Sequence, residues 1–139
     1  MKPITRILVA GIALFMLANG LGFWFAYDQI SPLYQLALDN PLARAGVRAD
    51  IGGFFLVVAA LTSYAAAKRN PQAAMIAAGM FLVAVTGRLL SVVFDGAAPQ
   101  GTLPMLVEAT SATILLWSSH VWSTEESETQ PGHFVTKLS

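Results

Sequence analysis

Long apolar runs separated by short polar segments constrain this 139-residue chain more than any other feature. The runs cover residues 7–27, 42–67, 71–95 and 103–122. A helix of about 20 apolar residues crosses the hydrocarbon core of a bilayer, and a helix satisfies its own backbone hydrogen bonds there. We therefore predict an all-α protein: an antiparallel bundle of four transmembrane helices over residues 1–122, followed by a polar, flexible cytoplasmic tail over residues 123–139.

Composition places the chain in the membrane class. Hydrophobic residues make up 55% of the sequence and charged residues 12%, half the charged fraction of about 25% that is typical of soluble domains. The mean hydropathy is +0.61. Because the formal net charge is zero, no basic field attracts nucleic acid. The expected partner is the lipid bilayer.

The absence of cysteine and the scarcity of histidine limit the available chemistry. Without cysteine, disulfides, thiolate nucleophiles and iron–sulfur ligation are excluded. The two histidines, His120 and His133, lie at the end of the fourth run and in the tail, so they cannot supply facing axial ligands to a haem. No metal-ligand spacing occurs. We therefore expect no cofactor, no metal and no catalytic residue.

Turn signals predict where the helices begin and end. Asn70 followed by Pro71 is typical of an N-cap with proline at the first helical position, and Asn40 with Pro41 repeats the pattern. Gly96 can take the left-handed conformation that ends a helix. The short links between the second, third and fourth runs predict antiparallel neighbours.

Basic residues near the ends of the runs predict the orientation, because positive residues are retained in the cytoplasm. Four of them flank the same side of the bundle: Lys2, Arg6, Lys68 and Arg69. Both termini are then cytoplasmic, in a multi-pass protein of the bacterial inner membrane. Arg44 and Arg48 oppose this orientation unless internal partners hold them. A cleaved signal peptide is the alternative for the first run, which is longer than a typical signal sequence.

Six polar or charged residues lie at membrane depth and form the candidate binding site: Arg48, Asp50, Arg88, Asp95, Glu108 and Asn19. A charge inside a bilayer costs several kcal/mol unless it is paired or hydrated. At about 1.5 Å per residue, Arg48 and Arg88 lie roughly 10 Å from the outer ends of their helices, and Glu108 roughly 8 Å. We expect these three charges to meet at one level of the outer leaflet, with Asp50 near that level but facing another way.

This charged layer has two interpretations. In the first, Glu108 lies between Arg48 and Arg88 in a buried ion-pair network that fixes helix order, a geometry that suits the forked guanidinium group. In the second, the layer is a pocket open to the outer leaflet. Its two arginines would hold a phosphate or carboxylate head group, and Glu108 would act as acid or base. The two interpretations are compatible.

Several short segments resemble a bacterial family of four-helix membrane proteins known as domain of unknown function 4345. They are residues 45–53 (AGVRADIGG), 86–90 (TGRLL) and 94–96 (FDG), together with Glu108. The resemblance covers roughly residues 8–122 and implies the family's fold and a place in the inner membrane, but no activity. Family members often carry an acidic residue shortly before the arginine of the second helix, whereas residues 45–47 here are Ala-Gly-Val.

These features support one functional hypothesis and its alternatives. The first is a non-enzymatic accessory or structural component of a membrane complex, possessing a stripe of small residues suited to helix–helix contact: Ala73, Ala77, Met80 and Ala84. The alternative is a protein that binds a lipid or isoprenoid in the charged layer. A third hypothesis is an enzyme acting on such a lipid, with Glu108 as the proton carrier.

Overall fold

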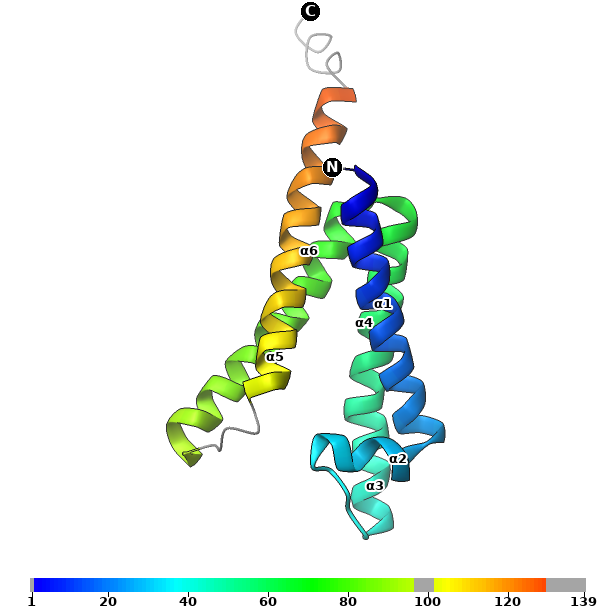
Figure 1. Ribbon diagram of the computed structural model, residues 1–139, viewed down its shortest axis with the longest axis vertical. Helices are drawn as coiled ribbons and strands as arrows, with labels where there is room; N and C mark the ends of the chain where they lie inside the picture. The colour runs from blue at the N-terminus through cyan, green and yellow to red at the C-terminus, as the bar shows by residue number, and fades with distance from the viewer. Residues whose placement is uncertain (1, 97–101, 130–139) are drawn as a thin grey trace, which may run out of the picture.

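Four long helical segments make up most of the computed structural model, which describes residues 2–96 and 102–129 and contains no strand within those ranges. They are α1 (Lys2–Phe25), a helix over Pro41–Lys68, α5 (Pro71–Asp95) and α6 (Thr102–Thr129). The second of these consists of α3 (Pro41–Val47), a π-helical turn η2 (Arg48–Gly52) and α4 (Gly53–Lys68). Figure 1 shows the order of the elements.

Three of these helices are long and apolar enough to cross a membrane: Pro3–Phe25, Pro41–Lys68 and Pro71–Asp95. The fourth predicted run lies in α6, which does not reach this level of hydropathy within the described residues. Its interior contains Glu108, His120 and several serines and threonines. The chain is thus an all-helical protein with three apolar helices of membrane-spanning length.

The ends of two helices follow the predicted turn signals. Asn40 accepts backbone N–H groups from Leu42 at 2.8 Å and from Ala43 at 3.4 Å. Asn70 likewise accepts the N–H of Ala73 at 2.8 Å. Each asparagine is followed by proline, whose missing N–H costs nothing at the first helical position. After α5, Gly96 has φ +60° and donates its N–H to the Ser91 carbonyl, which ends the helix.

The fourth predicted run ends at Trp122, but helix α6 continues for seven further residues to Thr129. Ser123 and Thr124 both donate their hydroxyls to the His120 carbonyl, which satisfies these polar side chains within the helix. The change to a polar sequence after Trp122 therefore does not end the helix. Residues 130–139 lie outside the described part of the chain.

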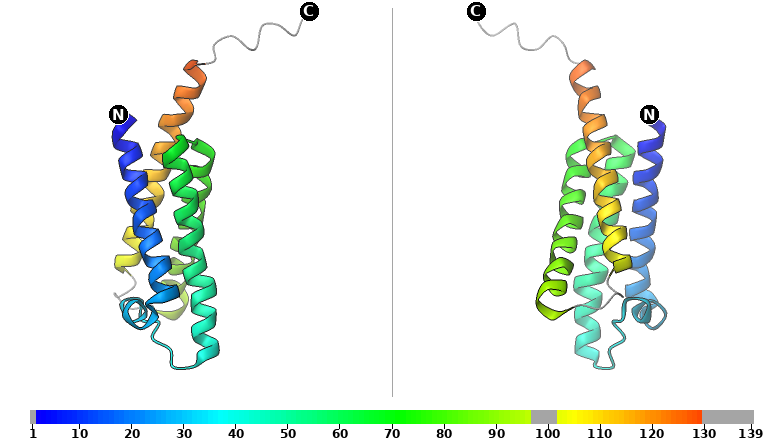
Figure 2. Two further views of the ribbon diagram at one scale, coloured as in Figure 1. Left: turned by 90° about the vertical axis from the view of Figure 1, so that its right-hand side faces the viewer. Right: turned by 60° about the vertical axis from the view of Figure 1, so that its left-hand side comes forward.

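The helices are arranged as two antiparallel pairs, with α1 against α4 and α5 against α6. The start of α1, the turn between α4 and α5, and the end of α6 lie at the same end of the molecule (Figures 1 and 2). The pairs contact each other at that end and diverge toward the other, where α2 (Tyr27–Ile30) and the 3₁₀ turn η1 (Ser31–Tyr34) lie beside the Pro41–Lys68 helix (Figure 1).

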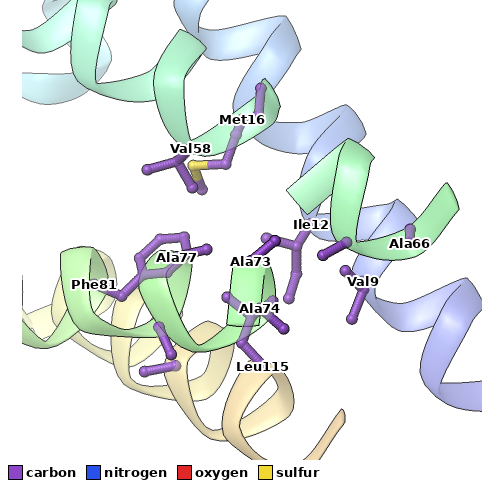
Figure 3. Close-up of a cluster of buried hydrophobic side chains, with 14 of the residues drawn as sticks. Val9, Ile12, Met16, Val58, Ala66, Ala73, Ala74, Ala77, Phe81 and Leu115 are labelled. Atoms are coloured by element: carbon purple, nitrogen blue, oxygen red, sulfur yellow. The ribbon is translucent and has the colours of Figure 1, made fainter. Parts of the chain in front are cut away.

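Small residues allow the two pairs to meet closely in the core. Figure 3 shows buried side chains of all four long helices pointing toward one another: Val9, Ile12, Met16, Val58, Ala66, Ala73, Ala74, Ala77, Phe81 and Leu115. Two buried hydrogen bonds add links between helices. Ser119 donates to the Pro71 carbonyl at 2.8 Å, and the Trp122 indole donates to the Thr5 hydroxyl at 3.1 Å.

The first predicted run ends earlier than expected. Helix α1 stops at Phe25, and Ala26 leaves the helical conformation with φ −129° and ψ 43°. Tyr27, predicted as the last residue of the run, begins α2 and is almost fully buried. Its hydroxyl donates to the Leu36 carbonyl at 2.6 Å, so the chain between α1 and α3 folds back onto the helices.

Candidate functional site

A pocket of about 690 Å³ lies where the two helix pairs diverge. One wall comes from η2 and α4, the opposite wall from α5 and the start of α6, and the third side from η1 and the residues after it. Most of its lining is apolar: Leu33, Leu36, Ile51, Phe54, Phe55, Met80, Val83, Ala84 and Pro104. Its polar lining residues are Tyr34, Gln35, Asp50, Arg88 and Glu108.

A bidentate ion pair joins α5 to α6 at the pocket. Arg88 donates from Nε to Glu108 Oε2 at 2.8 Å and from Nη2 to Glu108 Oε1 at 2.9 Å. The arginine side chain is 37% exposed and the glutamate only 14%. This parallel geometry is the strong form of the arginine–carboxylate contact, and it lets the carboxylate lie at depth without an unpaired charge. The structure thus contains the predicted contact between Arg88 and Glu108.

Tyr34 connects the pocket to α1. Its hydroxyl donates to Asn19 Oδ1 at 2.5 Å, and the Asn19 amide donates to the Phe15 carbonyl at 2.8 Å. The ring lies 5.2 Å from that of Phe23 and 5.7 Å from that of Phe55. Burial raises the pKa of the Tyr34 phenol; the Arg88 charge lowers it and the Glu108 charge raises it, by smaller amounts. The phenol therefore stays protonated at neutral pH.

Arg48 does not join the Arg88–Glu108 pair, contrary to the predicted three-way cluster. Its guanidinium carbon lies 5.3 Å from the centroid of the Tyr27 ring, and it forms no ion pair with any described residue. Its carbonyl accepts the Trp24 indole N–H at 3.0 Å. Arg48 is the first residue of the π turn η2, which holds one more residue than an α-helical turn and so offsets the residues before it from the faces that a regular α-helix would give them.

Asp50 and Asp95 also lie elsewhere than the sequence predicted. Asp50 was expected to face away from the charged layer, but it is the member of η2 that lines the pocket with its neighbour Ile51. Asp95 is exposed at the end of α5, does not line the pocket and forms no ion pair within the described ranges. The pocket therefore combines Asp50, Arg88 and Glu108, with Asn19 linked to it through Tyr34.

The contribution of the segment between α1 and α3 was not predicted from the sequence. Tyr34 carried no signal of its own, because its partners Asn19 and Phe55 are separated from it in sequence and only tertiary packing brings them together. The second charge contact, between Arg44 Nη1 and Asp28 Oδ1 at 3.1 Å, was also missed. It gives Arg44 a partner within the chain, whereas Arg48 has only the contact with the Tyr27 ring.

The Arg88–Glu108 ion pair places charged groups in a pocket whose lining is mostly apolar. Within the described ranges, no group of three or more His, Asp or Glu side chains lies close enough to hold a metal ion. The paired carboxylate and the neutral phenol can hydrogen-bond a ligand. The apolar walls fit a hydrocarbon chain better than a polar metabolite.

Comparison with known protein families shows which family the chain belongs to. The family model described as domain of unknown function (DUF4345) matches residues 4–119. The chain belongs to this family. The match agrees with the resemblance found in the sequence and covers the four long helical segments up to Ser119. No curated protein and no solved structure gives a match to this DUF4345 protein.

Proposed function

We propose that this DUF4345 protein is a multi-pass protein of the bacterial inner membrane that binds a lipid-like or isoprenoid-like amphiphile in the pocket between its helix pairs. The observation that carries the proposal is the pocket of about 690 Å³, whose lining is mostly apolar and includes the polar residues Tyr34, Gln35, Asp50, Arg88 and Glu108. Its size falls within the range of about 300–1,000 Å³ typical of small-molecule sites. A purely structural ion pair requires no such enclosure.

The membrane placement rests on helix composition and on the distribution of charge. Three apolar helices have spanning length, and α6 lies against α5 and contacts α1, so it would cross the bilayer with them. Arg6 belongs to the first turns of α1, and Lys68 and Arg69 belong to the end of α4 and the turn that follows it. These two parts of the chain lie at the same end of the molecule (Figure 1). The bias of positive residues toward the cytoplasm then places both termini there.

The accessory-subunit hypothesis has less support. Its sequence basis was the stripe of small residues Ala73, Ala77, Met80 and Ala84. Ala73 and Ala77 are buried in the chain's own core, and Met80 and Ala84 line the pocket. These four residues therefore pack in the chain's own core or line its pocket, and they leave no stripe of small residues for a partner subunit. Lipid binding is the function that we favour.

The test is to fill the pocket and measure the amphiphile that co-purifies. Ala84→Phe places a ring into the pocket, and Ala60→Phe makes the same substitution on the exposed face of α4. Lipids extracted after gentle solubilisation are quantified by mass spectrometry against protein. We expect one amphiphile at near-equal molar amount in the wild type and Ala60→Phe, and its loss from Ala84→Phe. Equal retention by Ala84→Phe would refute the proposal.

A further inference from the structure

The charge state of the pocket restricts the head group of its ligand. Arg88 supplies one positive charge, whereas Glu108 and Asp50 supply one negative charge each, so the charged groups that line the pocket leave one net negative charge. The second arginine that could have reversed this balance, Arg48, lies over the Tyr27 ring. A phosphate or carboxylate head group therefore meets no free positive charge here.

Hydrogen-bonding capacity remains on both members of the ion pair. A guanidinium has five N–H donors, and Arg88 uses one from Nε and one from Nη2 for Glu108. Each Glu108 oxygen accepts one of these bonds and retains a second acceptor site. The pair thus offers free donors and free acceptors side by side, with the Arg88 side chain 37% exposed.

A hydroxyl group can hydrogen-bond to both members of the ion pair at once. Its oxygen accepts from an Arg88 N–H, and its hydrogen is donated to a Glu108 oxygen. A carboxylate only accepts hydrogen bonds, so at the same place it is repelled by Glu108. An ammonium only donates: Glu108 and Asp50 attract it, but it cannot accept from Arg88, which repels it. Both charged head groups leave one member of the pair facing a like charge.

We infer that the pocket selects an uncharged amphiphile with a hydroxyl head group, such as a long-chain or isoprenoid alcohol, and that Glu108 excludes anionic lipids by neutralising Arg88. The inference rests on the proposed function and specifies its ligand class. It reverses the expectation, drawn from two converging arginines, that the site holds a phosphate or carboxylate.

The experiment compares oleyl alcohol, oleate and oleylamine, which share one hydrocarbon chain and differ in head group. Each radiolabelled probe is titrated onto the immobilised full-length protein in detergent near pH 8. We expect the wild type to bind the alcohol at least about tenfold more tightly than oleate, the factor that one charge-assisted hydrogen bond supplies, and more tightly than oleylamine, which Arg88 repels. Tighter binding of oleate or of oleylamine than of the alcohol would overturn the inference.

Variants of the pair test the role of Glu108. Glu108→Gln leaves Arg88 charged, so we expect oleate to gain at least about tenfold and to equal or exceed the alcohol. The double variant Arg88→Gln/Glu108→Gln lacks the free cation and should not gain oleate. Asp95→Asn changes the net charge equally outside the pocket and should bind like the wild type. A gain of oleate by Asp95→Asn or by the double variant would contradict the assigned role.

The outcomes separate this inference from the proposed function. If no probe binds the wild type, the proposed function fails and the inference fails with it. If oleate binds best, lipid binding stands and only the selection of an uncharged head group is wrong. Should Glu108→Gln not fold, the comparison of the three probes on the wild type still decides the inference.

Discussion

Gly52 and Gly53 are adjacent in sequence but have different surroundings, which allows a matched test of packing at the π turn. A Cβ atom added to Gly52 would lie 2.8 Å from Cδ1 and 3.0 Å from Nε1 of Trp24, and 3.3 Å from Cβ of Phe23. A Cβ atom added to Gly53 would have nothing within 4 Å. We therefore expect Gly52→Ala to destabilise the protein and Gly53→Ala to stabilise it.

The magnitudes follow from three terms. Alanine in place of glycine inside a helix stabilises it by about 0.5–1 kcal/mol, and this is the whole expected effect at Gly53. At Gly52 the same gain is opposed by displacement of the Trp24 ring, since overpacking costs about 1–3 kcal/mol. The displaced indole also loses its 3.0 Å bond to the Arg48 carbonyl, worth about 1 kcal/mol. The net destabilisation is about 1–3 kcal/mol.

The assay is reversible unfolding of the purified protein in mixed micelles, followed by circular dichroism for the wild type and both variants. Trp24→Ala in the Gly52→Ala background supplies a control, because removal of the indole should abolish most of the difference between the two alanine variants. If Gly52→Ala is as stable as Gly53→Ala, the close contact between Trp24 and the π turn does not exist as described.

Three further predictions concern single side chains. Burial is the chief reason why the pKa of Tyr34 is raised above 10.0. The stability that the protonated phenol contributes is therefore complete below about pH 10 and is lost as the pH rises through the folded-state pKa. In unfolding curves measured over a pH series, Tyr34→Phe should show a smaller loss of stability at alkaline pH than the wild type. The buried Ser118 hydroxyl has no hydrogen-bond partner among the residues that the structure describes, whereas Ser119 donates to a carbonyl. In thermal melts Ser118→Ala should be neutral or stabilising and Ser119→Ala should destabilise by about 1 kcal/mol, and the reverse order would contradict these hydrogen-bond assignments. Trp122→Phe removes the indole bond to the Thr5 hydroxyl and should cost about 1 kcal/mol or more in denaturant titrations, while an unchanged midpoint would mean that the bond contributes nothing.

Local signals in the sequence were sufficient for the helices and for some of their ends. Helix α5 covers residues 71–95 as predicted, because Asn70 caps its first turn and Gly96 takes the left-handed conformation at its end. Such capping residues act on their neighbours in the sequence, so they can be predicted from the sequence alone. The return of the chain after Phe25 was not predicted, because it depends on hydrogen bonds such as that from Tyr27 to the distant Leu36 carbonyl.

The candidate site was predicted in part for a related reason. Counting depth along two regular helices was sufficient to bring Arg88 and Glu108 to one level, and the structure joins them. The same count gave only the depth of Arg48, since it ran from residue 41 through the regular helix α3. The face of Arg48 relative to α4 depends on residues 48–52, where the structure has a π turn in place of a regular α-helix. No periodic pattern in the sequence reports such a turn, which is held in part by tertiary contact with Trp24.

The π turn also lets the Pro41–Lys68 helix tolerate the loss of one residue. A single π turn holds one more residue than the α-helical turn it replaces, so deletion of Ala49 would convert the wide turn into a regular one without breaking the helix. The residues on either side would keep their faces, because both kinds of turn complete one revolution, and Phe54 and Phe55 would still line the pocket. The π turn is thus the place in this helix where one codon can be lost while the order of the helices and the α4 wall of the pocket stay the same.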